Sequence, residues 1–139
     1  METGLTGKVV LITGASGGLG AEMARSFAGE GARLVLHYHT QREAAEAVAA
    51  ELDVDDCCVV GADLTSESEV ARLWNEAEAQ LGPVEIVVAN AGIWAPEEIP
   101  IHEMSLEHWS LTVTTDLTSV FLCMRAFFRG IRDHRLHDP

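Results

Sequence analysis

Residues 9–20 read VVLITGASGGLG, and this stretch reveals more about the architecture than any other part of the chain. The apolar run at its start is typical of a buried strand, and an Ala-rich stretch of helical composition follows the glycines. Gly14 would allow a sharp turn, Gly18 would leave room for a ligand against bare backbone, and Gly20 would let the helix pack close to the sheet. A strand, a Gly-rich loop and a helix in this order predict a binding site for a nucleotide pyrophosphate.

Apolar runs alternate with helix-forming stretches along the rest of the chain. The pattern predicts strands at 8–13, 33–38, 57–62 and 85–89, and helices at 18–29, 42–52, 66–81 and from about 106 to 131. Unbroken apolar strands are buried on both faces, and helices between consecutive strands make the strands parallel. We therefore expect one α/β domain over residues 1–139, a doubly wound parallel sheet of Rossmann type.

Composition limits the partners and the compartment. Nine Lys and Arg residues stand against 22 Asp and Glu residues, and the formal net charge of -13 would repel a nucleic acid. No apolar run reaches the length of a membrane span and the amino terminus lacks the order of a secretion signal, so a cytoplasmic protein without membrane contact is expected. Three cysteines without metal spacing are interpreted as buried apolar residues, and six scattered histidines as surface residues, so no metal site is expected.

The last predicted helix carries a broad apolar stripe. Its members recur at helical spacing: Val113, Leu117, Val120, Phe121, Met124, Phe127, Phe128 and Ile131. Such a stripe must be covered, either by core packing against the sheet or by a second copy of the helix at 106–131 in a homo-oligomer. The sequence leaves both possibilities open.

Three motifs in the expected order resemble the short-chain dehydrogenase/reductase family. The family fingerprint T-G-x-x-x-G-x-G matches the sequence from Thr13 to Gly20, Ala62-Asp63-Leu64 follows the third strand, and Asn90-Ala91-Gly92 follows the fourth. The resemblance covers the chain from Gly7 to about Phe128. It implies an oxidoreductase that moves a hydride between a nicotinamide dinucleotide and a carbonyl or alcohol substrate.

The resemblance also assigns the cofactor contacts to the loops that follow the strands. They are Gly14, Ala15, Ser16, Gly17, Gly18, Leu19, Gly20, Tyr38, His39, Arg42, Asp63, Leu64, Asn90, Ala91 and Gly92. Asp63 would meet the adenine; a turn or helix cap is the alternative for an Asp at this position, and the two roles are compatible. Asn90 would stabilise the centre of the sheet beside the cofactor, and its alternative is a plain turn at the end of a strand.

The end of the second strand bears on the choice of cofactor. Enzymes of this shape that use NAD usually place a carboxylate there for the ribose hydroxyls, whereas this chain has Tyr38 and His39 followed by Arg42. A guanidinium suits the 2′-phosphate of NADP, so NADP(H) is favoured over NAD(H). Gly17 stands where many NADP-dependent relatives carry a basic residue, and an exposed arginine at a helix start remains the alternative for Arg42.

The proton-transfer residues of the resembled family do not match this chain. The family uses a Ser and a Tyr-x-x-x-Lys pair, but Tyr38 is the only tyrosine and Lys8 the only lysine here. Asp116 occupies the position of the family's Asn that supports a water relay, and it is the one candidate catalytic residue. We expect a cofactor-binding portion truncated after about four strands, without the carboxy-terminal catalytic half, and inactive by itself.

Two other functions are alternatives to the redox enzyme. A non-enzymatic module could sense NADP(H) or scaffold a partner through the Phe-rich helix. A methyltransferase with a related Gly loop would need an acid at the end of the second strand, which Tyr38 does not provide.

Overall fold

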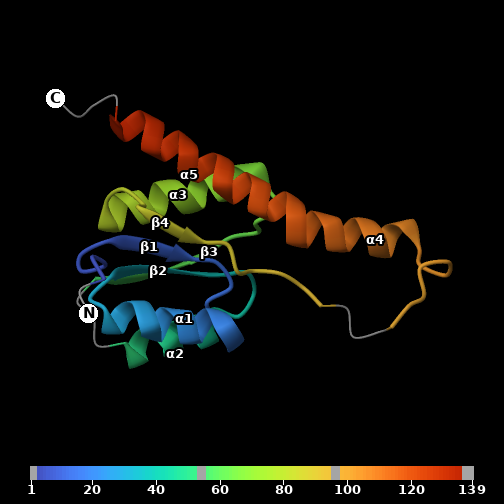
Figure 1. Ribbon diagram of the computed structural model, residues 1–139, viewed down its shortest axis with the longest axis horizontal. Helices are drawn as coiled ribbons and strands as arrows, with labels where there is room; N and C mark the ends of the chain where they lie inside the picture. The colour runs from blue at the N-terminus through green and yellow to red at the C-terminus, as the bar shows by residue number, and fades with distance from the viewer. Residues whose placement is uncertain (1–2, 53–55, 95–97, 136–139) are drawn as a thin grey trace.

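The computed structural model describes residues 3–52, 56–94 and 98–135 and has a four-stranded parallel sheet at its centre (Figure 1). The strands are β1 (Val9–Ile12), β2 (Arg33–Tyr38), β3 (Cys57–Gly61) and β4 (Ile86–Val88), in the spatial order β3-β2-β1-β4. Each predicted strand is confirmed to within one residue at each end. The chain winds outward from β1 to β3 and then returns to place β4 on the other side of β1. The carboxyl ends of β1 and β4 therefore form a topological switch point, where ligands bind in open α/β sheets.

Both faces of the sheet are covered, as the unbroken apolar strands predict. Helices α1 (Gly18–Gly29) and α2 (Arg42–Glu51) lie on one face, and α3 (Glu67–Leu81) and α5 (Ser119–Arg135) lie on the other (Figure 1). Alternate strand residues feed two separate cores, since Val10 and Leu34 pack toward α1 while Leu11 and Val35 pack toward α3. The doubly wound α/β architecture is confirmed.

Helix α3 begins and ends where its sequence predicts. The Ser66 hydroxyl accepts a hydrogen bond from the Glu69 amide at 3.4 Å, which caps the helix, and Gly82 terminates it with a φ of 82°. Leu73, Trp74 and Ala77 face the sheet and are buried. This pattern fixes the orientation of α3 on the sheet and the position of the loop from Asp63 to Ser66.

The long terminal helix has three parts rather than one. Helix α4 (Leu106–Val113) runs through a π-helical segment, η1 (Thr114–Thr118), into α5. Among the described residues α4 buries no side chain, and Figure 1 shows it extending beyond the sheet. Only α5 therefore acts as a covering layer.

The apolar stripe of this helix is only partly covered: three of its eight members are exposed and the other five are half-buried. Leu117, Phe121 and Phe128 are 65%, 57% and 62% exposed, whereas Leu122 and Cys123 are buried. Of the predicted stripe, Phe127 packs partly against the core. Core packing therefore accounts for part of the stripe and leaves Leu117, Phe121 and Phe128 uncovered in the described part of the chain.

One helix bears on the expectation that the chain makes no membrane contact. The helix from Leu106 to His134 is 29 residues long with a mean hydropathy of 1.3 in its most apolar window, so by length and composition it is able to cross a bilayer. The search for unbroken apolar runs misses this helix because polar residues such as Ser110 and Asp116 interrupt the run. A helix that packs on a sheet, as α5 does here, passes the same criterion.

Candidate functional site

The loop after β1 contains two glycines, Gly14 and Gly20, whose replacement by any other residue would introduce strain or a steric clash. Gly14 has a φ of 65°, and a Cβ at this position would lie 3.0 Å from the Cα of Ala91. A Cβ at Gly20 would lie 2.1 Å from the carbonyl oxygen of Gly14, far inside van der Waals contact. Gly20 therefore lets α1 start directly against the loop, as its sequence predicts.

The amino end of α1 has no side-chain cap. Its N-cap residue, Gly17, makes no capping hydrogen bond, whereas Ser66 and Ser105 cap α3 and α4. Gly18 has a φ of 55°, and a Cβ placed there meets no atom within 4 Å. The amides of a first helical turn have no acceptor within the helix, and the helix dipole makes this end positive. The start of α1 is thus open, bare and suited to an anion.

Thr13 and Asn90 hold the loops after β1 and β4 together. The Thr13 hydroxyl oxygen accepts hydrogen bonds from the amides of Asn90 and Ala91, each at 2.9 Å. The Asn90 side-chain amide donates to the carbonyls of Thr13 at 3.0 Å and Gly14 at 3.2 Å. Asn90 therefore fixes the two strand ends on either side of the switch point, which is more than a plain turn requires.

A trough runs along the carboxyl edge of the sheet. It consists of two adjoining hollows of about 450 and 440 Å³ that share His37, His39, Ala91, Gly92 and Ile93. Nine of the residues predicted to contact a cofactor line it: Gly14, Ser16, Gly17, His39, Asp63, Leu64, Asn90, Ala91 and Gly92. The structure thus brings together residues from all four loops that follow the strands.

The other predicted contacts lie around the trough. Ala15 is buried, and Gly18 and Leu19 belong to the exposed start of α1. The ring of Tyr38 lies over Gly61, where a Cβ would come 2.5 Å from the ring carbon Cζ. Arg42 begins α2, and its exposed side chain donates from Nε to Oε1 of Glu46 at 2.7 Å.

Asp63 forms the turn that was its alternative interpretation. Its Oδ1 accepts hydrogen bonds from the amide of Thr65 at 2.9 Å and from its hydroxyl at 2.7 Å. These bonds to Thr65 lower the pKa of the Asp63 carboxyl, because they favour its charged form. The same residue lines the trough, so its turn and its position beside a ligand are compatible.

His37 is a site residue that the sequence interpretation missed, and its placement among surface histidines was wrong. Its side chain is 1% exposed, and it lies between the Gly14 amide and the Ala62 carbonyl. Burial lowers the pKa of its imidazole. The strand pattern contained a clue, since His37 lies inside an apolar strand that is buried on both faces.

Asp116 lies in the π-helical segment and holds the loop after β4. Its Oδ1 accepts a hydrogen bond from the amide of Ile93 at 2.7 Å, and a Cβ at Gly92 would lie 3.1 Å from the same oxygen. Short π-helical turns within helices often occur at functional sites. Here the turn brings a carboxylate against Gly92 and Ile93, which line the trough.

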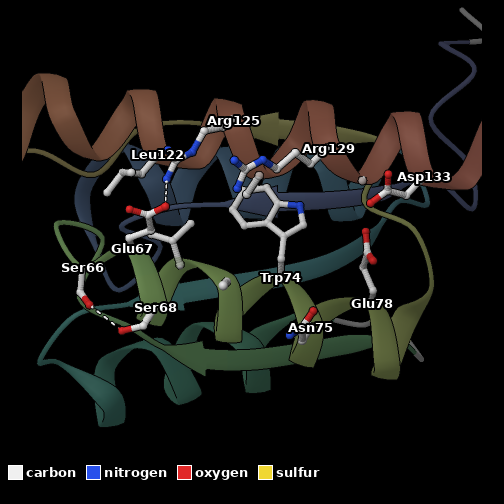
Figure 2. A pocket seen from close by; sticks show the side chains of 14 residues that line it. Ser66, Glu67, Ser68, Trp74, Asn75, Glu78, Leu122, Arg125, Arg129 and Asp133 are labelled. Carbon is white, nitrogen blue, oxygen red and sulfur yellow. Dashed lines mark hydrogen bonds and ion pairs between the residues drawn. The ribbon is translucent and has the colours of Figure 1, made fainter.

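A larger hollow of about 630 Å³ lies elsewhere, between α3 and α5 (Figure 2). Trp74 rises from α3 toward α5 in this groove, and Arg125 pairs with Glu67 across it. Carboxylates and guanidinium groups both line it, and none of the predicted site residues does. Its mixed charge offers no defined ligand chemistry, so the trough is the candidate site.

Comparison of sequences points to one family. The sequence model of the family described as short chain dehydrogenase matches residues 8–135. A short-chain type dehydrogenase/reductase of Picea abies is 36% identical over 129 residues, and a cis-4-hydroxycyclohexanecarboxylate dehydrogenase of Sinomonas cyclohexanicum is 39% identical over 118 residues. These matches cover 87% and 84% of this chain but 48% and 46% of the relatives. The chain spans about half the length of the curated relatives it matches.

Solved structures give the same result. A short-chain type dehydrogenase/reductase from Mycobacterium marinum matches with a TM-score of 0.86 and 31% identity, over 94% of this chain and 52% of that chain. A blue fluorescent protein from a metagenomic library, solved in complex with NADPH, matches with a TM-score of 0.81 and 30% identity, over 90% of this chain and 51% of that chain.

Proposed function

The chain belongs to the short-chain dehydrogenase family, and on this premise we propose that it binds a nicotinamide dinucleotide along the trough, with the pyrophosphate at the amino end of α1. The open start of α1 carries this proposal. The diphosphate would meet free backbone amides at the positive end of the helix. Gly17, Gly18 and Gly20 would leave the backbone there accessible because they have no side chains. Asn90 keeps the opposite wall in place.

The loop after β2 favours NADP(H) over NAD(H). Among the described residues Arg42 bonds Glu46 through Nε, and both terminal nitrogens of its guanidinium remain for a 2′-phosphate. An exposed i,i+4 pair of this kind contributes only about 0.3–0.5 kcal/mol, so it presents little obstacle to a phosphate. His39, exposed beside the trough, adds a second donor. A carboxylate, which would repel the phosphate, is absent from residues 38–42.

The function that follows is the cofactor-binding part of a carbonyl or alcohol oxidoreductase. The bound nicotinamide would supply the hydride. The residues of this chain would bind and orient it, and Asp116 would position the loop at Gly92 and Ile93 through the Ile93 amide. Lys8 pairs with Glu85 at the amino edge of the sheet, opposite the trough, so it takes no part in proton transfer.

Fluorescence titration of the purified chain with NADPH and NADH tests the proposal. We expect saturable binding of both nucleotides and a lower Kd for NADPH. Arg42→Gln should raise the Kd for NADPH about tenfold, because one charge-assisted hydrogen bond to the 2′-phosphate is lost. The Kd for NADH should not change. Arg25→Gln is the control, because Arg25 also forms exposed ion pairs, with Glu22 and Glu51, and does not line the trough.

The outcomes separate the two parts of the proposal. Equal or tighter binding of NADH would overturn the role of Arg42, and failure to bind either nucleotide would overturn the nucleotide site. Reduction of a carbonyl substrate by the purified 139-residue chain would show that its own residues complete the proton transfer.

A further inference from the structure

His37 joins the phosphate-binding loop to the neighbouring strand. The Gly14 amide donates a hydrogen bond to its Nδ1 at 3.1 Å, and its Nε2 lies 2.9 Å from the carbonyl oxygen of Ala62, just beyond β3. The backbone carbonyl of His37 also accepts a bond from the Ala15 amide at 2.8 Å. One buried residue of β2 thus holds two successive residues of the loop.

Only one protonation state of His37 satisfies both side-chain contacts. Gly14 can only donate through its amide, so Nδ1 must be unprotonated, and the Ala62 carbonyl can only accept, so Nε2 must carry the proton. A second proton would place an N–H group against the N–H of Gly14. The imidazolium is therefore incompatible with the observed position of the loop.

We infer that His37 is a positioning residue, and that its protonation shifts the loop at Gly14 and weakens binding of the dinucleotide at the start of α1. The inference rests on the proposed nucleotide site. Gly14 is the point at which the chain leaves β1 for the loop, and its carbonyl lies directly against Gly20 of α1. A displacement of Gly14 is thus transmitted to the amides that would meet the pyrophosphate.

Other charged groups around His37 give distinguishable effects. His39 follows β2 directly and disfavours the charge on His37, and its exposed side chain lines the trough. Asp63 follows β3 and lines the trough, but it is already charged well above its lowered pKa. Asp116 approaches from η1 at Gly92. Neither the phosphate loop from Gly14 to Gly20 nor residues 89–93 after β4 carry a titratable side chain.

Calorimetric titration with NADP⁺, from pH 8 down to the lowest pH at which the chain remains folded, tests the inference on three proteins. In His37→Asn, the side-chain oxygen takes the place of Nδ1 as acceptor for Gly14 but does not titrate. In His37→Gln, the amide nitrogen takes the place of Nε2 as donor to Ala62, and the acceptor for Gly14 is lost. Circular dichroism at each pH checks that the proteins remain folded.

The wild-type chain should lose affinity with acid relative to His37→Asn, approaching about tenfold per pH unit once His37 takes up its proton. His37→Gln should bind weakly at every pH. The titration of the 2′-phosphate is common to all three and cancels in the ratios. His39→Gln should keep the acid-dependent loss, which excludes His39 as its source.

The same pH profile for wild type and His37→Asn would overturn the inference. The backbone amide shift of Gly14 in the nucleotide-free chain is a second, independent readout. It should move with the His37 imidazole titration in the wild type and stay constant in His37→Asn. If Gly14 responds in this way and NADP⁺ binds at no pH, the proposed nucleotide site is wrong although the coupling exists; if Gly14 does not respond, the coupling itself is wrong.

Discussion

Gly20 lies at the closest approach between α1 and the loop after β1. A methyl group there would overlap the Gly14 carbonyl at 2.1 Å and crowd the Asn90 amide at 2.9 Å. Both neighbours are held by other bonds, so neither yields easily. The position therefore ties the stability of the fold to the geometry of the site.

Gly20→Ala should accordingly destabilise the protein by about 2 kcal/mol or more, as overpacking in a core does. Gly29→Ala is the control, since it lies in the same helix and its new methyl group would meet nothing within 4 Å. It should leave stability unchanged or raise it by up to about 1 kcal/mol. Urea unfolding measures both, and equal stability of the two variants would refute the packing argument.

Burial of neutral His37 also makes stability depend on pH. Its folded pKa is lowered below the ordinary 6.5, so the unfolded chain binds more protons than the folded one just below that pH. The contribution of His37 is fully present above about pH 6.5 and is lost as the pH falls from there toward the folded pKa. Between pH 7.5 and 5.5, His37→Asn should lose less unfolding free energy than the wild type in urea melts. An equal loss in the two proteins would show that His37 does not titrate differently on folding.

At the scale of single residues, the sequence predicted the glycines well and the histidine poorly. Gly14 and Gly20 are recognisable because backbone geometry leaves few alternatives at a sharp turn and a close approach. His37 stands between Leu36 and Tyr38 near the end of a strand, where a polar side chain commonly points to solvent. Its burial depends on two backbone partners 23 and 25 residues away, which no local pattern contains.

At the scale of elements, α5 shows which part of an apolar pattern packs. The sheet side of the helix is made of Ser119, Leu122 and Cys123, whereas the larger Phe121 and Phe128 point outward. Helical spacing predicted the helix but not the buried face, because apolar residues occur around most of its circumference. Smaller side chains allow the helix to approach the sheet, and only the tertiary structure shows this choice.

Leu122→Ala and Phe128→Ala should therefore differ sharply although both remove large apolar side chains from one helix. Leu122 is 7% exposed and its truncation should cost about 2–4 kcal/mol of unfolding free energy. Phe128 is 62% exposed, and its truncation should change stability by less than about 0.5 kcal/mol. Denaturant unfolding at low protein concentration measures the unfolding free energy of both variants. A larger loss for Phe128→Ala would mean that this face is covered.

The link between η1 and the loop after β4 gives another prediction. Asp116→Ala removes the acceptor of the Ile93 amide and should cost about 1 kcal/mol, since the bond is exposed to water. Asp116→Asn keeps an acceptor oxygen and should restore most of this loss. Hydrogen exchange at the Ile93 amide should accelerate in the Ala variant and much less in the Asn variant. Unchanged exchange in both would remove Asp116 from its positioning role.

At the scale of the whole molecule, two surfaces favour self-association: the outer edge of β4 and the exposed apolar face of the terminal helix. In the part of the chain that the structure describes, β4 pairs with β1 alone, which leaves its other edge free of strand partners. The exposed side chains Leu117, Phe121 and Phe128 lie along the same terminal helix. We expect self-association of the chain, and sedimentation of the double variant Phe121→Ser, Phe128→Ser should show less of it than the wild type. A wild type that sediments as a monodisperse monomer would contradict this expectation.

The fold could be predicted from the sequence at this scale because strand burial, loop glycines and helix caps agree along the chain. The trough could be predicted in outline, since the carboxyl ends of parallel strands meet at one edge. The groove between α3 and α5 and the outward face of α5 arise from the packing of elements distant in sequence. No local sequence pattern predicts either feature.

Backbone amide shifts of the isotopically labelled chain during titration with NADPH test most directly whether the start of α1 holds the dinucleotide. The largest changes should fall on residues 16–20, with smaller ones at Asn90 to Gly92, while the indole signal of Trp74 in the groove between α3 and α5 stays in place. Shifts confined to that groove, or no saturable shift at residues 16–20, would contradict the proposed site.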